Sequence, residues 1–412
     1  MTTRDFTPGD DPAHPVVFMI LIAPFGVMGG YLTVAIAYLL AQAGLTVAEV
    51  AALVAASFIP QTWKFLWAPV ADTTLSRKRW YVIASVVSAF GIFATGAIPA
   101  TPRSLPLLYI VVIVSNFAVT FLAMSTESLM AYDTPGDRKG RAGGWFQAGN
   151  LGGGGLGGGA GLWMAQNLSE PWIAGGVLAV VCLACCAALL FIREPPPTPR
   201  ASSYLRDLGS VLRDLWSVAK SRSGALALLI CFLPLGTGAA SGLWSAVADD
   251  WHASADTVAL VTGVASGFVS AAGCFIGGWI CDRMDRKYAY GLFGVALAVC
   301  AVLMALAPRT EPMFVIYTTA YSLLSGFSYA AFSAVVLEVI GRGAAATKYN
   351  LFASLSNMPI AYMTVVDGWA HTRWGAGGML YTEAVVGVAA MGVFVAASAL
   401  RPGRRAGAPA GS

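Results

Sequence analysis

The sequence predicts an all-α membrane protein with twelve transmembrane helices in two related bundles of six. Charged residues make up only 11% of the chain and hydrophobic residues 57%, whereas a soluble domain carries about 25% charged residues. A charged turn also occurs twice, and its two aspartates, Asp72 and Asp282, lie 210 residues apart in a chain of 412 residues. A separation of about half the chain length indicates that two similar halves follow one another.

Twelve apolar segments are each long enough to cross a bilayer, which takes about 20 residues of helix. In the first half they lie near residues 16–42, 47–70, 80–99, 106–130, 143–165 and 172–192. In the second half they lie near residues 224–248, 256–281, 288–307, 313–340, 349–371 and 376–400. We therefore expect an N-terminal bundle over residues 1–192 and a C-terminal bundle over residues 224–412.

The linker between the bundles, residues 193–223, has two parts. Residues 194–200 (EPPPTPR) are rich in proline and predict a stiff, extended segment. Residues 202–220 place leucines on one helical face and charged residues on the other, which suits a helix lying on the inner membrane surface. A solvated linker helix fits this pattern about as well.

Basic residues fall mainly on one side of the predicted membrane. The two termini, the linker and the turns on the same side hold 21 of the 25 Lys and Arg residues. Only Arg103, Arg309 and Arg373 fall on the opposite side, and Lys64 lies within a span. By the positive-inside rule, we expect both termini in the cytoplasm and the protein in a bacterial inner membrane. Residues 1–15 also lack the basic start of a cleavable signal peptide.

The predicted fifth span is unusually rich in glycine. Gly149, Gly153, Gly157 and Gly161 recur every four residues and therefore lie on one face of a helix. Such a face lets a second helix approach closely. A phosphate-binding loop would instead need a Gly-Lys-Ser/Thr ending after a strand, and the sequence has neither. We therefore predict a helix-packing surface.

Two motifs and the predicted topology resemble a known family of transporters. The turns that begin at Asp72 and Asp282 are similar to the charged D-x-x-x-R-K turn of the major facilitator superfamily, with Asp285 where that motif usually has glycine. Residues 64–72 (KFLWAPVAD) resemble the K-F-L-W-[SA]-P-x-x-D signature of the AmpG-type muropeptide permeases and the related acetyl-coenzyme A transporters. Residues 345–357 resemble the start of span eleven in the same family.

This resemblance implies a short, twelve-span secondary transporter that works by alternating access of its two bundles. In that superfamily, spans one, four, seven and ten line the central cavity. The charged turns would then form an inner gate that holds the outward-facing state. The gating candidates are Asp72, Arg77, Asp282, Arg283 and Arg286.

Ionisable residues inside predicted spans are candidates for function, because a charge in the hydrocarbon core costs about 2.5–3.5 kcal/mol on insertion scales. Glu127 and Glu338 occupy matching places in spans four and ten, and Asp367 lies near the outer end of span eleven. We predict that these three carboxylates are candidates for proton coupling. A structural ion pair, or a side chain that reaches the cytoplasmic surface, fits the two glutamates equally well. Glu383, near the outer end of span twelve, fits a surface position better.

Lys64 shares its predicted depth in the membrane with Glu127, so we expect an ion pair between them. The alternatives for Lys64 are a side chain that reaches the membrane surface and a ligand for an anionic substrate group. Further candidates for substrate binding are Asn116, Gln147, Asn150, Trp244, Tyr321, Tyr329, Asn350 and Asn357. Hydroxyls and amides can replace water around a sugar or a peptide, although packing explains each of these residues about as well.

Other classes of function lack their sequence signals. The seven cysteines lie in apolar spans as packing residues, and the three histidines have no metal-ligand spacing. The enzyme motifs H-E-x-x-H and G-x-S-x-G do not occur, and the basic residues are too dispersed to bind nucleic acid. We expect no metal, no cofactor and no catalytic residue.

These observations predict a monomeric symporter that takes up a small polar organic solute, such as a muropeptide, together with protons. The sequence has no ATP-binding loop, so we expect transport to be driven by an ion gradient. Membrane lipid is the expected solvent around the chain. A siderophore or other metabolite permease, and a drug or metabolite exporter, are alternatives with the same fold. A membrane sensor or scaffold is the alternative that does not transport.

The distribution of basic residues predicts that the linker faces the cytoplasm. A cysteine introduced at Ser202 should react with a membrane-impermeant maleimide only after the cells are opened. The basic residues that flank Ser202 place this segment on the cytoplasmic side by the positive-inside rule. Labelling of Ser202→Cys in intact cells would contradict this topology. A cysteine at Arg103, on the opposite side, serves as the positive control for labelling from outside.

Overall fold

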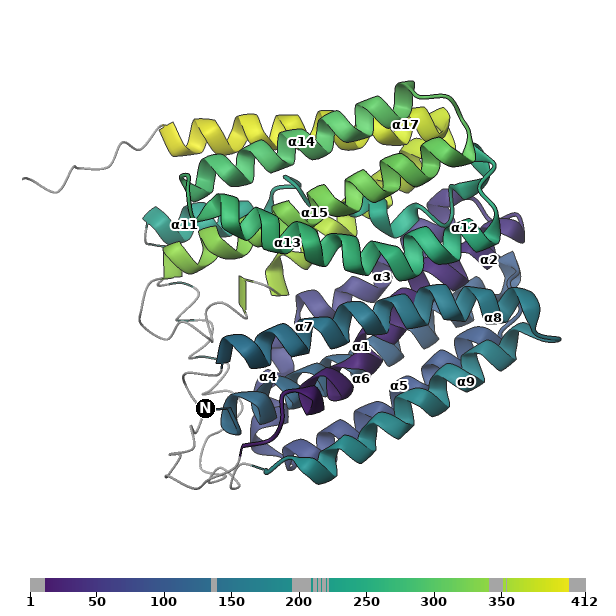
Figure 1. Cartoon of the computed structure of the whole chain (residues 1–412), viewed down its shortest axis with the longest axis vertical. Helices are drawn as coiled ribbons and strands as arrows, with labels where there is room; N and C mark the ends of the chain where they lie inside the picture. The colour runs from purple at the N-terminus through teal and green to yellow at the C-terminus, as the bar shows by residue number, and fades with distance from the viewer. Residues whose placement is uncertain are drawn as a thin grey trace, which may run out of the picture.

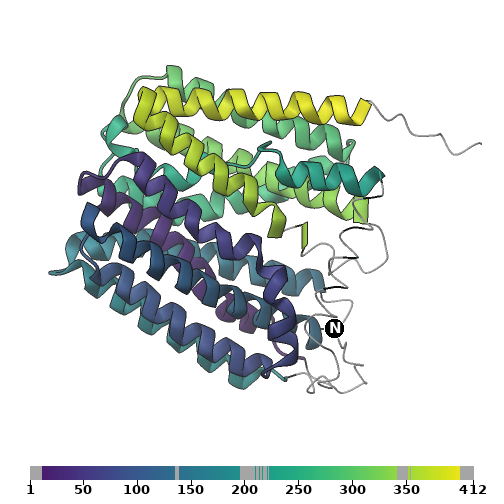
Figure 2. The same ribbon diagram turned by 180° about the vertical axis from the view of Figure 1, so that it is seen from behind.

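The structure of the chain is a computed structural model that describes residues 12–134, 139–194, 222–340, 351–352 and 354–399, with isolated positions 209, 213, 216 and 220. Every regular element in these residues is helical. The helices run roughly side by side and form two groups, one from the N-terminal half and one from the C-terminal half of the chain (Figures 1 and 2). The predicted amphipathic helix at 202–220 falls largely outside the described residues.

The N-terminal half supplies helical segments at all six predicted spans. Their bounds are α1 (Val16–Gly30), η1 (Tyr31–Ile36) and α2 (Ala37–Gln42); α3 (Val47–Thr62) and α4 (Lys64–Thr73); α5 (Arg77–Ala97); η2 (Pro102–Ser104) and α6 (Leu105–Tyr132); α7 (Lys139–Gly155), η4 (Leu156–Ala160) and α8 (Gly161–Asn167); α9 (Pro171–Ala184) and η5 (Cys185–Phe191). The expected order of elements in this half is therefore present.

The C-terminal half repeats the pattern with more interruptions. Its segments are α11 (Arg222–Phe232), η6 (Ala239–Leu243) and η7 (Ala248–Trp251); α12 (Ala255–Val258), η8 (Ala259–Ala265) and α13 (Ser266–Cys281); α14 (Arg286–Leu306); α15 (Glu311–Ile340); and α17 (Asn357–Ala399). The last helix covers two predicted spans and bends at Gly375, whose φ of 69° reverses the chain. Figure 2 shows the two arms of α17 as a V.

Among the described residues, seven helical stretches are long and apolar enough to cross a membrane. They cover residues 16–42, 77–97, 102–132, 171–191, 255–281, 286–306 and 357–397. Many of their large apolar side chains are exposed, such as Phe90 at 69%, Phe268 at 72% and Phe275 at 81%. An apolar exterior of this extent fits lipid as the surrounding solvent, and it confirms the predicted all-α membrane class.

The seventh predicted span is broken, which differs from the continuous segment expected over residues 224–248. Helix α11 ends at Phe232, and Gly236 and Gly238 then adopt positive φ angles of 63° and 64°. Pro234 has no amide hydrogen to continue a helix, and glycine reaches the left-handed region at little steric cost. The sequence PLGTG at 234–238 was the available signal for this interruption.

The glycine face of span five is a helix-packing surface, as predicted, and the helix that packs against it is span one. An added Cβ atom at Gly149, Gly153 or Gly157 would lie only 2.1–2.3 Å from a backbone oxygen of α1, at Met19, Ala23 and Val27 respectively. The contacts are regular because the glycines on span five and the facing residues on α1 both recur every four residues.

The two charged turns begin new helices by capping them. Ser76 accepts the amide hydrogen of Arg79 at the start of α5, at 3.4 Å. Asp285 accepts the amide hydrogens of Lys287 and Tyr288 at the start of α14, at 2.9 and 3.3 Å. The aspartate that replaces the usual glycine of the motif is therefore an N-cap, which satisfies amide donors that the helix leaves unpaired.

The glycine contact predicts a position-specific effect on stability. Gly153→Ala should lower the free energy of unfolding by about 1–3 kcal/mol, because the new methyl group has no room against the α1 backbone. Gly152→Ala is the matched control, since nothing lies within 4 Å of its added Cβ atom, and it should be neutral or stabilising by about 0.5–1 kcal/mol. Thermal unfolding in detergent measures both, and equal melting temperatures would refute the contact.

Candidate functional site

A cavity of about 300 Å³ lies between the two halves of the chain. The N-terminal half contributes Thr33, Val34 and Phe58, and the C-terminal half contributes the remaining wall. That wall consists of Thr237, Gly238, Ala239, Ser241, Gly242, Trp244, Thr262, Ser266, Ser270, Thr318, Ser322, Ser325, Ile360 and Thr364. Ten of these residues carry hydroxyl groups, and none of the described lining residues is charged.

Most of these hydroxyl groups donate their hydrogen to a backbone carbonyl oxygen. Thr33 donates to Gly29 at 2.9 Å, and Ser266 donates to Thr262 at 2.7 Å. Similar bonds hold Ser241, Thr262, Ser270, Thr318, Ser322 and Thr364. A hydroxyl that donates in this way keeps its oxygen lone pairs as acceptors. The cavity wall is therefore neutral and presents mainly hydrogen-bond acceptors.

The broken part of span seven forms one side of this cavity. Thr237 and Gly238 of the non-helical segment line it directly, and so does Ala239 at the start of η6. Gly238 lies so close to α15 that an added Cβ atom would be 2.8 Å from the Ser325 hydroxyl oxygen. Non-helical backbone at membrane depth is tolerated where it is buried in protein or lines a cavity, and both conditions hold for this segment.

Two carboxyl groups lie behind the cavity wall in the two arms of α17. Asp367 is completely buried, with an exposure of 0%, and neither of its oxygens has a hydrogen-bond partner among the described residues. Glu383 accepts hydrogen bonds from the Tyr321 hydroxyl and from the Ala240 amide, the latter at 3.1 Å. The Glu383 carboxyl group is near enough to Asp367 for the two groups to interact electrostatically. The surface position expected for Glu383 is therefore wrong, because its carboxylate is engaged inside the bundle.

Trp244 joins this group to the cavity. It lines the cavity and packs edge-on against Tyr321, with ring centroids 5.2 Å apart and an interplanar angle of 89°. Tyr321 itself has an exposure of 0%. A chain of contacts thus leads from the cavity through Trp244 and Tyr321 to Glu383.

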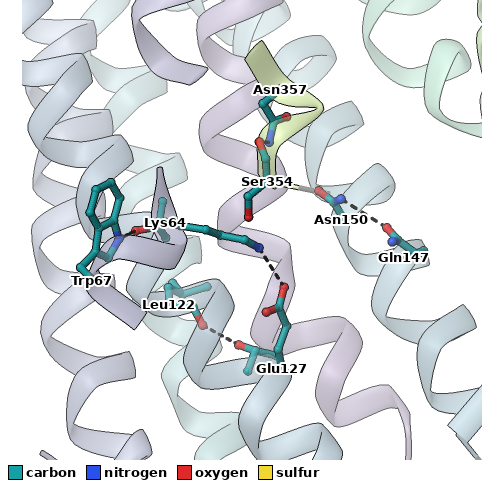
Figure 3. Close-up of polar contacts among 10 residues, drawn as sticks. Lys64, Trp67, Leu122, Glu127, Gln147, Asn150, Ser354 and Asn357 are labelled. Atoms are coloured by element: carbon teal, nitrogen blue, oxygen red, sulfur yellow. Dashed lines mark hydrogen bonds and ion pairs between the residues drawn. The ribbon is translucent and has the colours of Figure 1, made fainter. Parts of the chain in front are cut away.

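The expected ion pair between Lys64 and Glu127 is present, with Lys64 Nζ 3.5 Å from Glu127 Oε1. Figure 3 shows the lysine side chain reaching from α4 to the glutamate on α6. Both side chains are partly exposed, at 20% and 25%. Neighbouring Trp67 donates its indole hydrogen to Thr120 at 2.9 Å. Neither charged residue is among those that line the cavity.

The other predicted binding residues lie in several places. Asn116 is buried and donates to Val112 of its own helix at 2.9 Å. Asn150 donates to Gln147 at 3.3 Å (Figure 3). Asn357 donates to the Ser354 carbonyl at 3.2 Å, also visible in Figure 3. Tyr329 is 60% exposed.

Of the predicted binding residues in the described part of the chain, Trp244 lines the cavity. Asn350 lies outside the described residues. Glu338 belongs to α15, and the placement of its side chain is not described. The hydroxyl residues of the wall were largely missed, because single serines and threonines in a membrane helix are uninformative until their shared direction is known.

The predicted gating residues lie at one end of the bundle. Arg77 donates to the Ala71 carbonyl oxygen just before the first charged turn. Arg283 donates to the Trp279 carbonyl oxygen at 3.1 Å and lies over the Trp279 ring, 3.8 Å from its centroid. Asp282 is exposed, and Arg286 begins α14. The side chain of Asp72, in α4, is not described.

The two halves touch at the opposite end, which we call the predicted outer end (residues 42–48, 249–254 and 371–375). Gln42 donates to both oxygens of Asp249 at 2.9 and 2.8 Å, and the Ala48 amide donates to Thr372 at 3.3 Å. Close backbone packing supports these bonds: added Cβ atoms at Gly263 and Gly368 would lie 2.5 and 2.3 Å from the other half. The halves are thus joined at the predicted outer end.

A second charged group lies at the same end within the C-terminal half. His371 Nε2 is 2.6 Å from Asp250 Oδ2, and the Arg309 guanidinium lies 4.2 Å from the centroid of the Trp251 ring. Burial lowers the pKa of Arg309, and the nearby Asp250 carboxylate acts in the opposite direction. No group of His, Cys, Asp or Glu among the residues that the structure describes could hold a metal ion.

Two helical halves around a central polar cavity define the architecture of a membrane transporter, and comparisons with known proteins agree. A sequence profile of the Major Facilitator Superfamily matches residues 16–240. No curated protein matches the chain. The chain belongs to the Major Facilitator Superfamily and is a transporter. This family confirms the predicted fold and the prediction that the protein is a transporter and not an enzyme.

Solved structures of transporters share this fold. A mutant of the nucleoside transporter NupG superposes with a TM-score of 0.71 at 14% identity, covering 93% of this chain and 98% of that chain. A bacterial homologue of the human lysosomal transporter Spinster, inward-facing and unoccupied, gives 0.72 at 14% identity with 93% and 96% covered. A D-xylose–proton symporter gives 0.67 at 14% identity with 92% and 96% covered.

The contact between Gln42 and Asp249 predicts a shift between conformations. Asp249→Ala should favour forms open at the predicted outer end by about fivefold, because the lost hydrogen bonds contribute about 1 kcal/mol at an exposed site. Spin-label distances across this end measure the shift. Asp256→Ala, an exposed acid a few residues further on, should leave the distances unchanged, and identical distances in both variants would contradict the role of Asp249.

Proposed function

We propose that the protein is a proton-driven secondary transporter for a small, uncharged polar solute rich in hydrogen-bond donors. The observation that carries this proposal is the hydroxyl-lined cavity between the two halves. Its volume lies at the lower end of the range of about 300–1,000 Å³ found for small-molecule sites. The solute would bind there and leave on the other side after the halves rearrange, as alternating access requires.

The chemistry of the wall selects the class of solute. At least eight lining hydroxyl groups give their hydrogen to the backbone, so their oxygens are available to accept hydrogen bonds from a ligand. Hydroxyl and amide groups of a sugar or sugar derivative provide such donors. A charged solute would lose its hydration without a compensating charge on the described wall, which is costly.

The AmpG-type motif at residues 64–72 supports a sugar-containing solute, such as a muropeptide, as the specific substrate. A muropeptide also carries carboxylates, and Lys64 is the base that the motif places in the membrane. In the structure Lys64 is engaged by Glu127, so it would have to exchange that partner for the substrate. A small neutral sugar needs no such exchange and is the simpler solute for this cavity.

Proton coupling is supported by carboxyl groups inside the membrane. Glu127, Asp367 and Glu383 all belong to membrane helices, and ionisable residues within membrane helices mark ion pathways in transporters. One protein of similar fold is by name a D-xylose–proton symporter. The bacterial inner membrane, which maintains a proton gradient, is the proposed location.

The proposal predicts uptake driven by a pH gradient. Proteoliposomes containing the protein should accumulate a neutral sugar or sugar derivative from a labelled panel of sugars, muropeptide, dipeptide and siderophore. Collapse of the pH gradient with an ionophore should abolish accumulation while exchange of the solute continues. Accumulation of anionic members alone would contradict the neutral-solute proposal, and gradient-independent accumulation would contradict proton coupling.

A matched pair of threonines tests the cavity itself. Thr33→Val should raise the KM about fivefold, because one hydrogen bond to the solute contributes about 1 kcal/mol. Thr95→Val is the control: Thr95 also lies in the N-terminal half and, like Thr33, donates to the carbonyl four residues earlier, at 2.7 Å, but it does not line the cavity.

A further inference from the structure

Two residues of the cavity wall, Trp244 and Ser325, differ from the others in their hydrogen bonding. Both line the cavity. Neither the Trp244 Nε1 atom nor the Ser325 hydroxyl group has a hydrogen-bond partner among the described residues, although both polar atoms are buried. A buried donor that is left without an acceptor destabilises the structure that contains it. An acceptor that reaches these two donors would therefore be bound favourably.

Three hydroxyl residues of α15 line the cavity, and one of them is bonded differently from the other two. Thr318 donates to the Phe314 carbonyl oxygen at 2.7 Å, and Ser322 donates to the Thr318 carbonyl oxygen at 2.9 Å. Bonds of this kind are common for hydroxyl groups in membrane helices. Ser325 makes no such bond among the described residues. Its hydrogen is therefore available to an acceptor that does not belong to α15.

Trp244 provides a donor next to the same face of α15. It directly follows η6 in span seven, and its ring packs edge-on against Tyr321, with ring centroids 5.2 Å apart. Tyr321 precedes Ser325 by four residues, which is about one helical turn. The Tyr321 hydroxyl gives its hydrogen to Glu383, so it adds no donor here. An indole N–H can only donate, so Trp244 offers the cavity nothing but a hydrogen.

Gly238 keeps the Ser325 hydroxyl next to the cavity. Gly238 lines the cavity, and an added Cβ atom would lie 2.8 Å from Ser325 Oγ and 3.8 Å from the Tyr321 ring. A side chain at this position would separate the hydroxyl from the cavity, and glycine avoids this. Trp244 and Ser325 thus both lie around the Tyr321 ring, and we call these two residues the donor pole.

The rest of the wall has the opposite character. Its bonded hydroxyl groups give their hydrogens to the backbone and offer oxygen lone pairs, which suit the hydroxyl hydrogens of a solute. A solute hydroxyl at the donor pole could accept there, but its own hydrogen would need a further acceptor. An oxygen that carries no hydrogen, such as the ring oxygen of a sugar or a carbonyl oxygen, only accepts. Such an oxygen is therefore the best match for the donor pole.

We propose that Trp244 and Ser325 are specificity-determining residues that bind a hydrogen-free oxygen of the solute and thereby fix its orientation. A cyclic sugar binds with its ring oxygen toward the donor pole and with its hydroxyl groups toward the remaining wall. This inference rests on the proposed function, the binding of a neutral polar solute in this cavity, and it names the group by which the solute is oriented.

Two probes that differ at one ring position test the donor pole. D-glucose is compared with its carbocyclic analogue, in which a methylene group replaces the ring oxygen, by calorimetric titration of the protein in detergent. The parent should bind glucose about tenfold more tightly, because the methylene group leaves buried donors unpaired. This ratio of affinities should fall toward one in Trp244→Phe, which keeps an aromatic ring, and in Ser325→Ala. No binding of glucose, a ratio near one in the parent, or an unchanged ratio in both variants would overturn the proposal.

Two matched variants separate this role from a general effect on the wall. Ser322→Ala removes a lining hydroxyl of the same helix whose hydrogen is already bonded. It should weaken the binding of both probes and keep their ratio. Trp251→Phe removes a buried indole N–H that also has no partner among the described residues but does not line the cavity, so both affinities should match the parent. A ratio that falls equally in these controls would contradict a specific role of the donor pole.

Ultraviolet resonance Raman spectroscopy observes the donor itself. The difference between the parent and Trp244→Phe isolates the bands of Trp244, and the band sensitive to indole hydrogen bonding should shift when glucose binds. If the shift and the affinity ratios appear but a pH gradient does not drive glucose accumulation, the donor pole stands and the proposed transport function is wrong. If a gradient drives glucose uptake with the same KM in the parent, Trp244→Phe and Ser325→Ala, the transport function stands and the donor pole is wrong.

Discussion

Backbone hydrogen bonding inside the membrane is the constraint on which the arrangement of this protein depends. Lipid offers no partners for amide and carbonyl groups, so a membrane segment is helical unless other protein groups satisfy it. Span seven breaks at Pro234 to Gly238, and the chain compensates with a side chain, since Glu383 accepts the Ala240 amide. A structural need of the backbone thereby brings a carboxylate next to the cavity wall.

Helix contacts in this protein use small residues because lipid gives little hydrophobic drive for two apolar helices to associate. The regular contact between the glycine face of α7 and the backbone of α1 makes the N-terminal half compact. Contacts of the same type, at Gly263 and Gly368, join the two halves at one end. Side-chain hydrogen bonds such as Gln42 to Asp249 add to contacts that the backbones already make.

The structure separates the groups that contact the cavity from the groups that carry charge. The described cavity wall is neutral and rich in hydroxyl oxygens, whereas the Lys64–Glu127 pair and the carboxyl groups of Asp367 and Glu383 are not among the groups that line it. This separation suits a transporter whose solute is recognised by hydrogen bonds while a proton changes the conformation. Trp244 and Tyr321 provide the physical contact between the two regions.

The sequence alone determined the membrane class, the order of helical segments, the glycine packing face and the pairing of Lys64 with Glu127. Each of these follows from local composition, or from a repeat or depth that can be counted along the chain. Tertiary structure decided which polar residues meet. The hydroxyl wall draws on residues of five separate spans, and Asp367 and Glu383 lie on the two arms of α17 because this helix turns back at Gly375. Direction around a helix and the contact between distant helices are set by packing, which no single segment encodes.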